Sequence, residues 1–338
     1  MTRATAPGRG GIIGNPSDMY GGTVVSCSIA ERAEATVSAS PRLIFDIYGQ
    51  WAEISDDSAL EFDPELHFLD VAKAVWRYLR RPEHGYTELI DPNATFHVRA
   101  QSTIPLKAGC AGSTAMLLVI LAGILNHFDV WLSRYELAEL ARRIERYELG
   151  VQCGYQDQYM IIFGGLNCID LRGKENNSDD RLTPYASVDP MHEDVPELPF
   201  ILANTGIQRS SGHFHAEPRR KWEEGDPKRR AGFERIGLLG RLGKKALLLR
   251  DWEWLGELMN ENHRLTDDLV GAGEANNRLI AAALAAGALG AKLSGAGRGG
   301  TIIALHEDPD WMGQRLLEAG AERLIRLKPV PGLTVERL

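Results

Sequence analysis

The chain of 338 residues is long enough for about two domains, and its 44% hydrophobic and 25% charged residues are an ordinary balance for a globular protein. A net charge of -8 does not favour nucleic acid or an anionic membrane as a partner, whereas a small anionic substrate stays compatible with local basic groups. Four scattered cysteines without a CxxC pair indicate neither a disulfide framework nor a zinc site, and no apolar run suits a membrane span or a signal core, so a cytoplasmic enzyme or binding protein is expected.

The first part of the chain is predicted to form strands around one sharp interruption. The β-prone runs are residues 6–13, 23–29 and 35–38. The segment between the first two, Gly14-Asn-Pro-Ser-Asp-Met-Tyr-Gly-Gly22, has the composition of a loop, and a plain hairpin loop would explain it. Apolar residues at helical spacing, Val71, Val75 and Leu79, then predict a helix over residues 66–81.

A loop of small residues, Pro105–Ala115, lies between a predicted strand and a predicted helix. Residues 94–104 alternate in polarity, which is typical of a half-buried strand, and residues 116–125 are almost wholly apolar, as in a buried helix. The first amides of a helix have no intrahelical partners, and glycine lets a phosphate approach the backbone. On this stretch alone, a phosphate-binding loop and a tight turn capped by Ser113 explain the residues equally well.

A second helix and a domain boundary follow. Ser133 and Glu136 have the spacing of a capping box and Gly150 is a suitable stop, so a helix is predicted between them, with Glu145 beside its apolar face. The polar stretch 172–196 is the best candidate for a boundary. We therefore expect an N-terminal domain of residues 1–190 and a C-terminal domain of residues 191–338.

The C-terminal part is predicted to combine helices with short strands. The expected helices are roughly 213–224, 228–248, 251–268, 274–287 and 308–319, and the expected strands are near 199–203, 291–293, 301–305, 323–327 and 333–337. A second glycine-rich loop, Ser294-Gly-Ala-Gly-Arg-Gly-Gly300, separates two of these strands.

Three separated motifs together resemble the three signatures of the GHMP small-molecule kinases, which include galactokinases, homoserine kinases and mevalonate kinases. They are Ala6-Pro-Gly-Arg9…Asp18…Gly22, Pro105…Gly109…Gly112-Ser-Thr-Ala115 and Leu293-Ser-Gly-Ala-Gly-Arg-Gly-Gly300, in order and over nearly the whole chain. The resemblance implies the α+β GHMP kinase fold. Its N-terminal domain would be like domain 2 of ribosomal protein S5, its C-terminal domain would be a ferredoxin-like α/β sandwich, and the active site would lie between them.

Within this family, the chain is similar to two groups of sugar kinases. Gly14-Asn-Pro-Ser-Asp18 and Ser211-Gly-His-Phe-His215 look like glucuronokinases, whereas Gly154-Tyr-Gln-Asp-Gln-Tyr159 and Thr205-Gly-Ile-Gln-Arg209 look like heptose 7-phosphate kinases. The resemblance implies an ATP-dependent kinase that phosphorylates a sugar hydroxyl, first of all the anomeric hydroxyl of glucuronate or a related sugar. A heptose 7-phosphate 1-kinase is the alternative, and a non-catalytic sugar or nucleotide sensor on the same fold is a third reading.

ATP and Mg²⁺ are the cofactors that the resemblance implies. The second motif would surround the ATP phosphates with Lys107, Ala108, Gly109, Cys110, Ala111, Gly112, Ser113 and Thr114. Ser113, or Thr114 in its place, would bind the metal together with Glu145, which stands twelve residues before Asp157. Glu148 competes with Glu145, because helix phase does not separate the two glutamates.

Asp157 corresponds to the catalytic aspartate of the family and would accept the proton of the sugar hydroxyl or orient that hydroxyl. Arg9 corresponds to the arginine beside that aspartate in galactokinase-like members, where it would keep Asp157 ionised and stabilise the developing charge.

The remaining candidates would bind the acceptor: Asn15, Asp18, Tyr20, Arg209, Gly295 and Gly297. Asp18 can accept two sugar hydroxyls, and Asn15 stands where galactokinases have a glutamate, so a different hydroxyl pattern is expected. The carboxylate of a uronic acid would require a cation, for which Arg209 is the first candidate, followed by Lys107 and Arg298. The expected partners are therefore ATP and a sugar or sugar acid, without nucleic acid or membrane, and with a homodimer as a further option.

Overall fold

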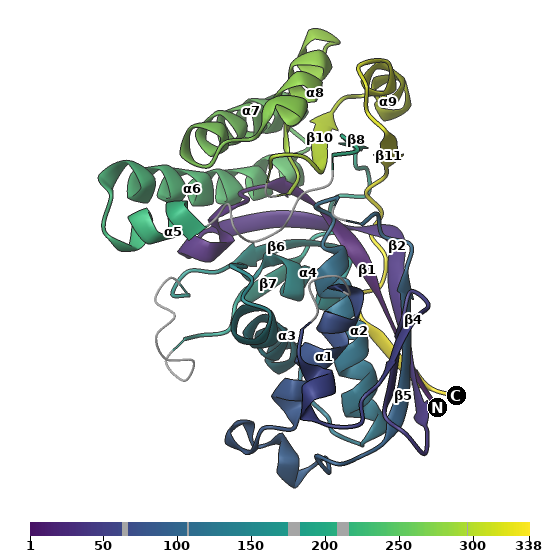
Figure 1. Ribbon diagram of the computed structural model, residues 1–338. Coiled ribbons are helices and arrows are strands. Elements are labelled where there is room, and N and C mark those ends of the chain that lie inside the picture. The colour runs from purple at the N-terminus through teal and green to yellow at the C-terminus, as the bar shows by residue number, and fades with distance from the viewer. Residues whose placement is uncertain (63–66, 107, 175–182, 208–215, 296) are drawn as a thin grey trace.

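Two sheets organise the molecule, a computed structural model that describes residues 1–62, 67–106, 108–174, 183–207, 216–295 and 297–338 (Figure 1). The larger sheet has the order β12-β1-β2-β5-β3-β4, with β6 pairing with β2 and with β7. Its strands are β1 (Thr2–Ile13), β2 (Thr23–Ala39), β3 (Ile44–Ile47), β4 (Gln50–Glu53), β5 (Phe96–Ser102), β6 (Leu166–Asp170), β7 (Ser187–Pro190) and β12 (Thr334–Arg337).

The long strand β2 explains why this sheet branches. Its first half, Thr23–Cys27, pairs with β6, its second half, Ala33–Ala39, pairs with β5, and β1 runs antiparallel beside it. The two β-prone runs predicted at 23–29 and 35–38 are therefore parts of one strand, because the polar segment between them stays paired to β1 or lies at its bulge.

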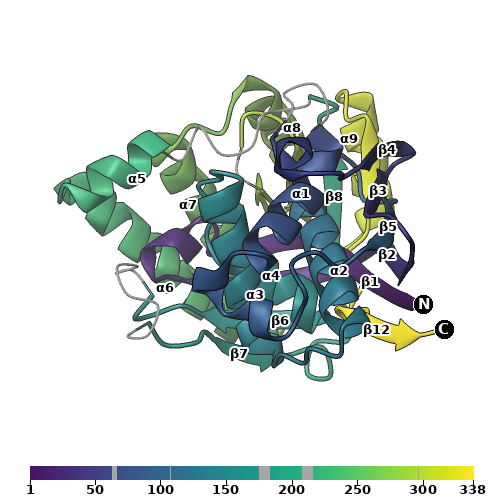
Figure 2. The same ribbon diagram turned by 60° about the horizontal axis from the view of Figure 1, so that its bottom comes forward.

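One face of the large sheet carries the helices α1 (His67–Leu79), α2 (Gly112–His127), α3 (Arg134–Arg143) and α4 (Gln156–Phe163), as Figure 2 shows. Every residue of α2 from Thr114 to Leu125 is buried, as expected for a helix that is apolar all round. The predicted capping box is confirmed, since the Ser133 and Glu136 side chains bond each other's backbone amides at the start of α3.

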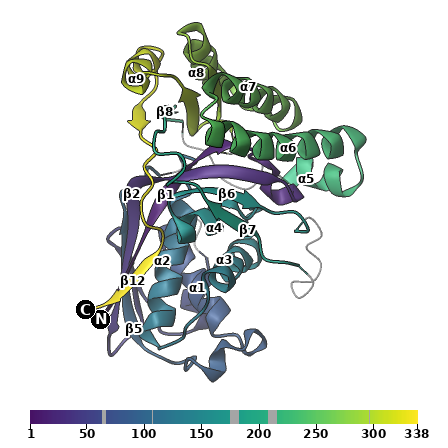
Figure 3. The same cartoon turned by 180° about the vertical axis from the view of Figure 1, so that it is seen from behind.

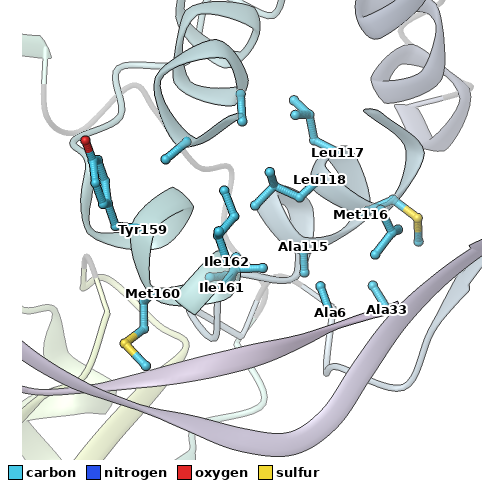
Figure 4. Close-up of a cluster of buried hydrophobic side chains, with 14 of the residues drawn as sticks. Ala6, Ala33, Ala115, Met116, Leu117, Leu118, Tyr159, Met160, Ile161 and Ile162 are labelled. Atoms are coloured by element: carbon cyan, nitrogen blue, oxygen red, sulfur yellow. The ribbon is translucent and has the colours of Figure 1, made fainter. Parts of the chain in front are cut away.

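Small side chains let α2 and α4 approach the strands closely (Figure 4). Ala6 of β1 and Ala33 of β2 lie near Ala115 and Met116, and all four are buried in the same core as Ile161 of α4. This packing fixes the first turns of α2 and α4 relative to β1, and these turns carry most of the predicted site.

The second sheet is antiparallel, with the order β11-β8-β10-β9, and has its own buried apolar cluster with α8 and α9. Its elements are β8 (Phe200–Asn204), β9 (Gly290–Leu293), β10 (Thr301–Leu305), β11 (Arg323–Ile325), α8 (Glu274–Ala285) and α9 (Pro309–Glu318). The helix α7 (Trp252–Leu269) packs on β9, α6 (Pro227–Leu249) packs on α7 and on β2, and α5 (Ala216–Glu223) lies against α6 (Figure 3). The α+β class is thus confirmed.

The end of the chain returns to the first sheet. β12 pairs antiparallel with β1, with Thr2 opposite Arg337, so the two termini lie side by side (Figure 3). The last strand therefore belongs to the sheet of the N-terminal half, while the division at residue 190 stays a prediction. Among the described residues, no helix is long and apolar enough to cross a membrane.

Candidate active site

The loop before α2 is held in place by its carbonyl groups. The Thr301 hydroxyl of β10 donates to the carbonyl of Ala108 at 2.7 Å. Arg9 of β1 donates from a guanidinium nitrogen to the carbonyl of Gly109 at 2.6 Å, and from its amide to that of Cys110 at 3.1 Å. Both sheets therefore fix this loop from the carbonyl side.

The start of α2 presents its amides without a protein cap. The N-cap residue is Ala111, in the left-handed conformation with φ 61°, and no side chain caps the helix. The unpaired amides and the helix dipole make this end suitable for a phosphate. Ser113 is exposed and does not cap the helix, so the alternative explanation of the loop as a turn capped by Ser113 is wrong.

Arg9 and Asp157 form a partly buried ion pair beside this loop. Arg9 Nε and Nη2 lie 2.8 and 2.6 Å from the same oxygen, Asp157 Oδ1. The Arg9 side chain is 8% exposed and that of Asp157, in the first turn of α4, is 29% exposed. The second oxygen, Oδ2, has no hydrogen-bond partner in the described part of the chain, so it can accept a hydrogen bond from a ligand hydroxyl.

Asp18 holds the beginning of α4. Its Oδ2 accepts the backbone amides of Tyr155 at 3.0 Å and Gln156 at 3.1 Å. A Cβ on Gly154 would lie 1.8 Å from the same oxygen, so a glycine is required for this approach. Burial raises the pKa of Asp18 and the two amides oppose that shift. Asp18 thus fixes the start of α4, which carries Asp157. The other oxygen of Asp18, Oδ1, can accept a hydrogen bond from a ligand.

Thr114 and Glu145 meet where α2 begins. The Thr114 hydroxyl donates to Glu145 Oε1 at 2.7 Å, and the Gln158 side chain donates to Oε2. Glu145 is 3% exposed and lies in a single turn of π-helix, Ile144–Glu148, that follows α3. Burial raises the pKa of Glu145 to about 7, the charge of Asp157 adds to this shift, and the hydrogen bonds from Thr114 and Gln158 oppose it.

Glu148, the competing glutamate, already has its cations. Its Oε1 lies 2.6 Å from Arg81 Nη1, and its Oε2 lies 3.4 Å from Arg77 Nε. The π turn buries both glutamates, so only their partners distinguish them. A hydroxyl and an unbalanced carboxylate at Thr114 and Glu145 fit a magnesium ion, which prefers oxygen ligands, better than the paired Glu148 does.

Asn15 is engaged by the third motif rather than open to a ligand. Its Nδ2 faces the carbonyls of Leu293, Ser294 and Gly295 at 3.3 to 3.5 Å, and its Oδ1 accepts from Lys292 Nζ at 2.6 Å. Lys292 is fully buried, which lowers its pKa to about 7. Sequence reasoning missed Lys292, although a lysine within the apolar strand β9 was a signal.

The third motif, the glycine-rich loop after β9, is held by a side chain of α8. Asn276 of α8 both donates to the carbonyl of Gly299 and accepts its amide, each at 3.1 Å. Gly297 and Gly299 have φ of 93° and 114°, which favours glycine. Arg298 is exposed, and the amide of Gly11 in β1 donates to the Ser294 hydroxyl at 2.9 Å, which joins the first and third motifs.

Tyr20 packs away from these groups. Its ring stacks on Phe233 at 3.7 Å between centroids, and Trp222 lies edge-on at 5.3 Å. Its hydroxyl is buried without a hydrogen bond in the described residues. Lys107, Arg209, His213 and His215, which the sequence singled out for the acceptor and the phosphates, lie outside the described residues.

Phosphoryl transfer depends on positioning and on neutralising charge. The described groups suit both tasks: uncapped amides for phosphate oxygens, a hydroxyl and a carboxylate for a hard cation, and an arginine-held aspartate for a hydroxyl. These groups fit a phosphotransferase that acts on an alcohol group.

Comparisons with known proteins give the family. Residues 70–165 match the model for the GHMP kinases N terminal domain, and residues 244–311 match the model for the GHMP kinases C terminal domain. The chain is 30% identical to "Probable glucuronokinase 2" of Arabidopsis thaliana over 323 residues, which covers 91% of this chain and 85% of that protein. The chain belongs to the GHMP kinase family.

Other relatives are kinases of different acceptors. A galactokinase of Thermococcus kodakarensis is 28% identical over 94% of this chain and 93% of its own length. A heptose 7-phosphate kinase of Campylobacter jejuni is 25% identical over 89% of this chain and 88% of its own length, and mevalonate kinases match similarly. The galactokinase structure of Lactococcus lactis in complex with galactose superposes with a TM-score of 0.80 at 21% identity, over 98% and 94% of the two chains, and confirms the fold.

Proposed function

We propose that this GHMP kinase transfers the γ-phosphate of ATP to a sugar hydroxyl, and that its acceptor is the anomeric hydroxyl of glucuronate or a related sugar. The observation that carries the proposal is the Arg9–Asp157 pair, whose unbonded Oδ2 lies in the same site as the uncapped start of α2. That arrangement provides a base for a hydroxyl next to a binding place for phosphate.

In this proposal the chain's own groups position the reactants. The amides from Gly109 to Ser113 hold the phosphates of ATP. Asp157 Oδ2 accepts the hydrogen bond of the acceptor hydroxyl and takes its proton as the hydroxyl oxygen bonds to the γ-phosphorus, while the bond from that phosphorus to the bridging oxygen breaks and ADP leaves. Arg9 fixes the orientation of the Asp157 carboxylate and stabilises negative charge close by. Asp18 keeps α4, and with it Asp157, in place.

The proposed metal site uses Glu145 with a hydroxyl of the first turn of α2. Among the described residues, no three His, Cys, Asp or Glu side chains stand close enough to hold a metal alone. This suits magnesium, which commonly binds one or two carboxylates together with substrate phosphates. When bound, the ion would neutralise phosphate charge. Thr114, which contacts Glu145, is a better candidate for the hydroxyl than Ser113, which does not.

Glucuronate is supported by the similarity to "Probable glucuronokinase 2". The Asn15 side chain bonds Lys292 and three backbone carbonyls. It therefore does not offer a sugar hydroxyl the two acceptor oxygens that a free carboxylate at this position would offer. We infer that Asp18 Oδ1 and Asp157 Oδ2 are the acceptor-facing oxygens.

The test is turnover of ATP with a panel of glucuronate, galacturonate, neutral hexoses, heptose 7-phosphate and mevalonate, with the product identified by phosphorus NMR. We expect the highest kcat/KM with glucuronate or a related sugar acid, phosphorylated at the anomeric position. Turnover with mevalonate and none with a sugar would contradict the proposal.

The heptose 7-phosphate kinase of Campylobacter jejuni supports the alternative acceptor. This alternative predicts that removing the 7-phosphate from the sugar lowers kcat/KM at least tenfold. A non-catalytic sensor would bind ATP and a sugar without forming product.

A further inference from the structure

Arg142 is a buried arginine that pairs with no carboxylate among the residues that the structure describes. Arg142, in the last turn of α3, is 3% exposed. In the described residues it makes no hydrogen bond or ion pair through its guanidinium, and Nε is buried without a partner. Its contact is the ring of Tyr155, whose centroid lies 3.8 Å from Cζ. Since an uncompensated buried cation is costly, an anion is expected to bind there.

The second cation at this ring is already neutralised. Lys174 Nζ lies 4.4 Å from the centroid of Tyr155 and 2.8 Å from Glu139 Oε1, and it donates to the carbonyl of Pro184 at 2.6 Å. Of the two cations at the Tyr155 ring, only Lys174 contacts a described carboxylate, that of Glu139. The positive charge left over belongs to Arg142.

The charge of Arg142 acts on the same small region as the site carboxylates. Tyr155 stands two residues before Asp157, and its backbone amide donates a hydrogen bond to Asp18 Oδ2. Burial chiefly raises the pKa of the Cys153 thiol, the charge of Glu145 raises it further, Arg142 lowers it, and Asp157 and Asp18 raise it, so Arg142 and these carboxylates act on one thiol. Arg142 therefore contacts the ring of the residue whose own backbone amide holds Asp18, one of the two carboxylates proposed to face the acceptor.

We propose that Arg142 is a specificity residue that binds the anionic substituent, a carboxylate or a phosphate, of the acceptor sugar. The inference rests on the proposed kinase function and names the substrate class: sugars that carry a negative charge. A guanidinium binds either anion through two parallel hydrogen bonds, and a neutral sugar would leave it unpaired.

The experiment compares three acceptors, glucuronate, glucose 6-phosphate and glucose, with the wild type and two variants. Arg142→Met keeps an unbranched apolar chain against Tyr155 and removes the charge. Lys174→Met is the matched control, because it removes the other cation of the same ring. We expect Arg142→Met to raise KM for the preferred anionic sugar at least tenfold and KM for glucose less than threefold. Lys174→Met should leave the ratio of these two KM values unchanged.

Equal changes for charged and neutral sugars, or the same shift of the ratio in Lys174→Met, would overturn the inference and assign Arg142 to packing alone. The anion preferred by the wild type, glucuronate or glucose 6-phosphate, identifies the carboxylate or the phosphate as the group bound. Tighter binding of glucose than of both anions would also overturn it.

Sugar binding measured by calorimetry without ATP separates this inference from the proposed function. If the wild type binds glucuronate but forms no product, the kinase proposal fails while the role of Arg142 is still read from the dissociation constants. If Arg142→Met does not fold, Arg142→Lys serves instead. It keeps the charge but not the paired donors, and a weakening of anion binding of less than twofold would contradict the bidentate contact.

Discussion

Arg9 bonds Asp157 through two nitrogens at one oxygen, Oδ1, at 2.8 and 2.6 Å, and leaves Oδ2 without a described partner. The pair therefore separates two tasks within one carboxylate. One oxygen fixes the side chain and its charge, and the other can accept a proton.

Asp157→Asn should lower kcat at least about 1000-fold, because the amide cannot act as a base although it keeps the size of the side chain. The dissociation constant of ATP, measured by calorimetry, should change less than threefold. Arg9→Met is the companion variant, and we expect a smaller loss of kcat because the base itself remains. An Asp157→Asn enzyme with wild-type turnover would refute the assigned role.

The hydroxyl that binds magnesium can be identified from Thr114→Val and Ser113→Ala. Thr114 contacts Glu145, whereas Ser113 is exposed. Thr114→Val should therefore raise the Mg²⁺ concentration for half-maximal activity about tenfold or more, since an apolar group replaces an oxygen ligand. Ser113→Ala should leave it within about twofold. The reverse order would restore Ser113 as the ligand.

Glu145 and Glu148 are separated by a second pair of variants. Glu145→Gln should abolish the response of activity to Mg²⁺ and leave folding intact. Glu148→Gln should lower the free energy of unfolding by about 1 kcal/mol, because Arg77 and Arg81 lose their carboxylate but stay partly solvated. Denaturant titration and metal titration measure the two effects. If Glu148→Gln alone removed the metal response, the assignment would be exchanged.

The metal-free protein should lose stability between about pH 4.5 and pH 7 through Glu145. Its pKa is raised from 4.5 to about 7 in the folded state, so the folded state binds this proton more tightly than the unfolded chain. This contribution is complete below the unfolded pKa, is lost as pH rises through about 7, and amounts to about 3 kcal/mol at most.

The measurement is the difference in free energy of unfolding between wild type and Glu145→Gln at each pH. The difference removes the effect of Lys292, whose pKa is lowered to about 7 and whose own contribution rises above that pH. Added Mg²⁺ should flatten the wild-type curve if the ion binds Glu145. A difference that does not vary with pH would show that Glu145 is charged throughout.

Gly154→Ala tests the contact between Asp18 and α4. The added Cβ would lie 1.8 Å from Asp18 Oδ2, so Asp18 or the start of α4 has to move. We expect kcat/KM for the acceptor to fall at least tenfold, with KM for ATP nearly unchanged. Gly123→Ala is the control inside α2, where the nearest atom, in Val37, lies at 3.0 Å. Equal effects of both variants would indicate a general loss of packing.

Local patterns in the sequence were enough to predict the helices α2 and α3 and the loop before α2. The apolar run 116–125 predicts a buried helix because a helix without a polar face has nowhere else to lie, and the capping box at Ser133 and Glu136 predicts the start of α3. The spacing of three motifs determined the family, which the comparisons confirm.

The partners of the site residues were decided only by the tertiary structure. Helix phase could not separate Glu145 from Glu148, because a π turn buries both. Their partners distinguish them: Arg77 of α1 and Arg81 after it contact Glu148, whereas Thr114 contacts Glu145. Likewise, Asn15 reads in sequence as a sugar ligand, yet Lys292, 277 residues away, takes its oxygen. A sequence determines which chemical groups are present, whereas the neighbours of a buried polar group come from distant strands and helices, so their role depends on the fold.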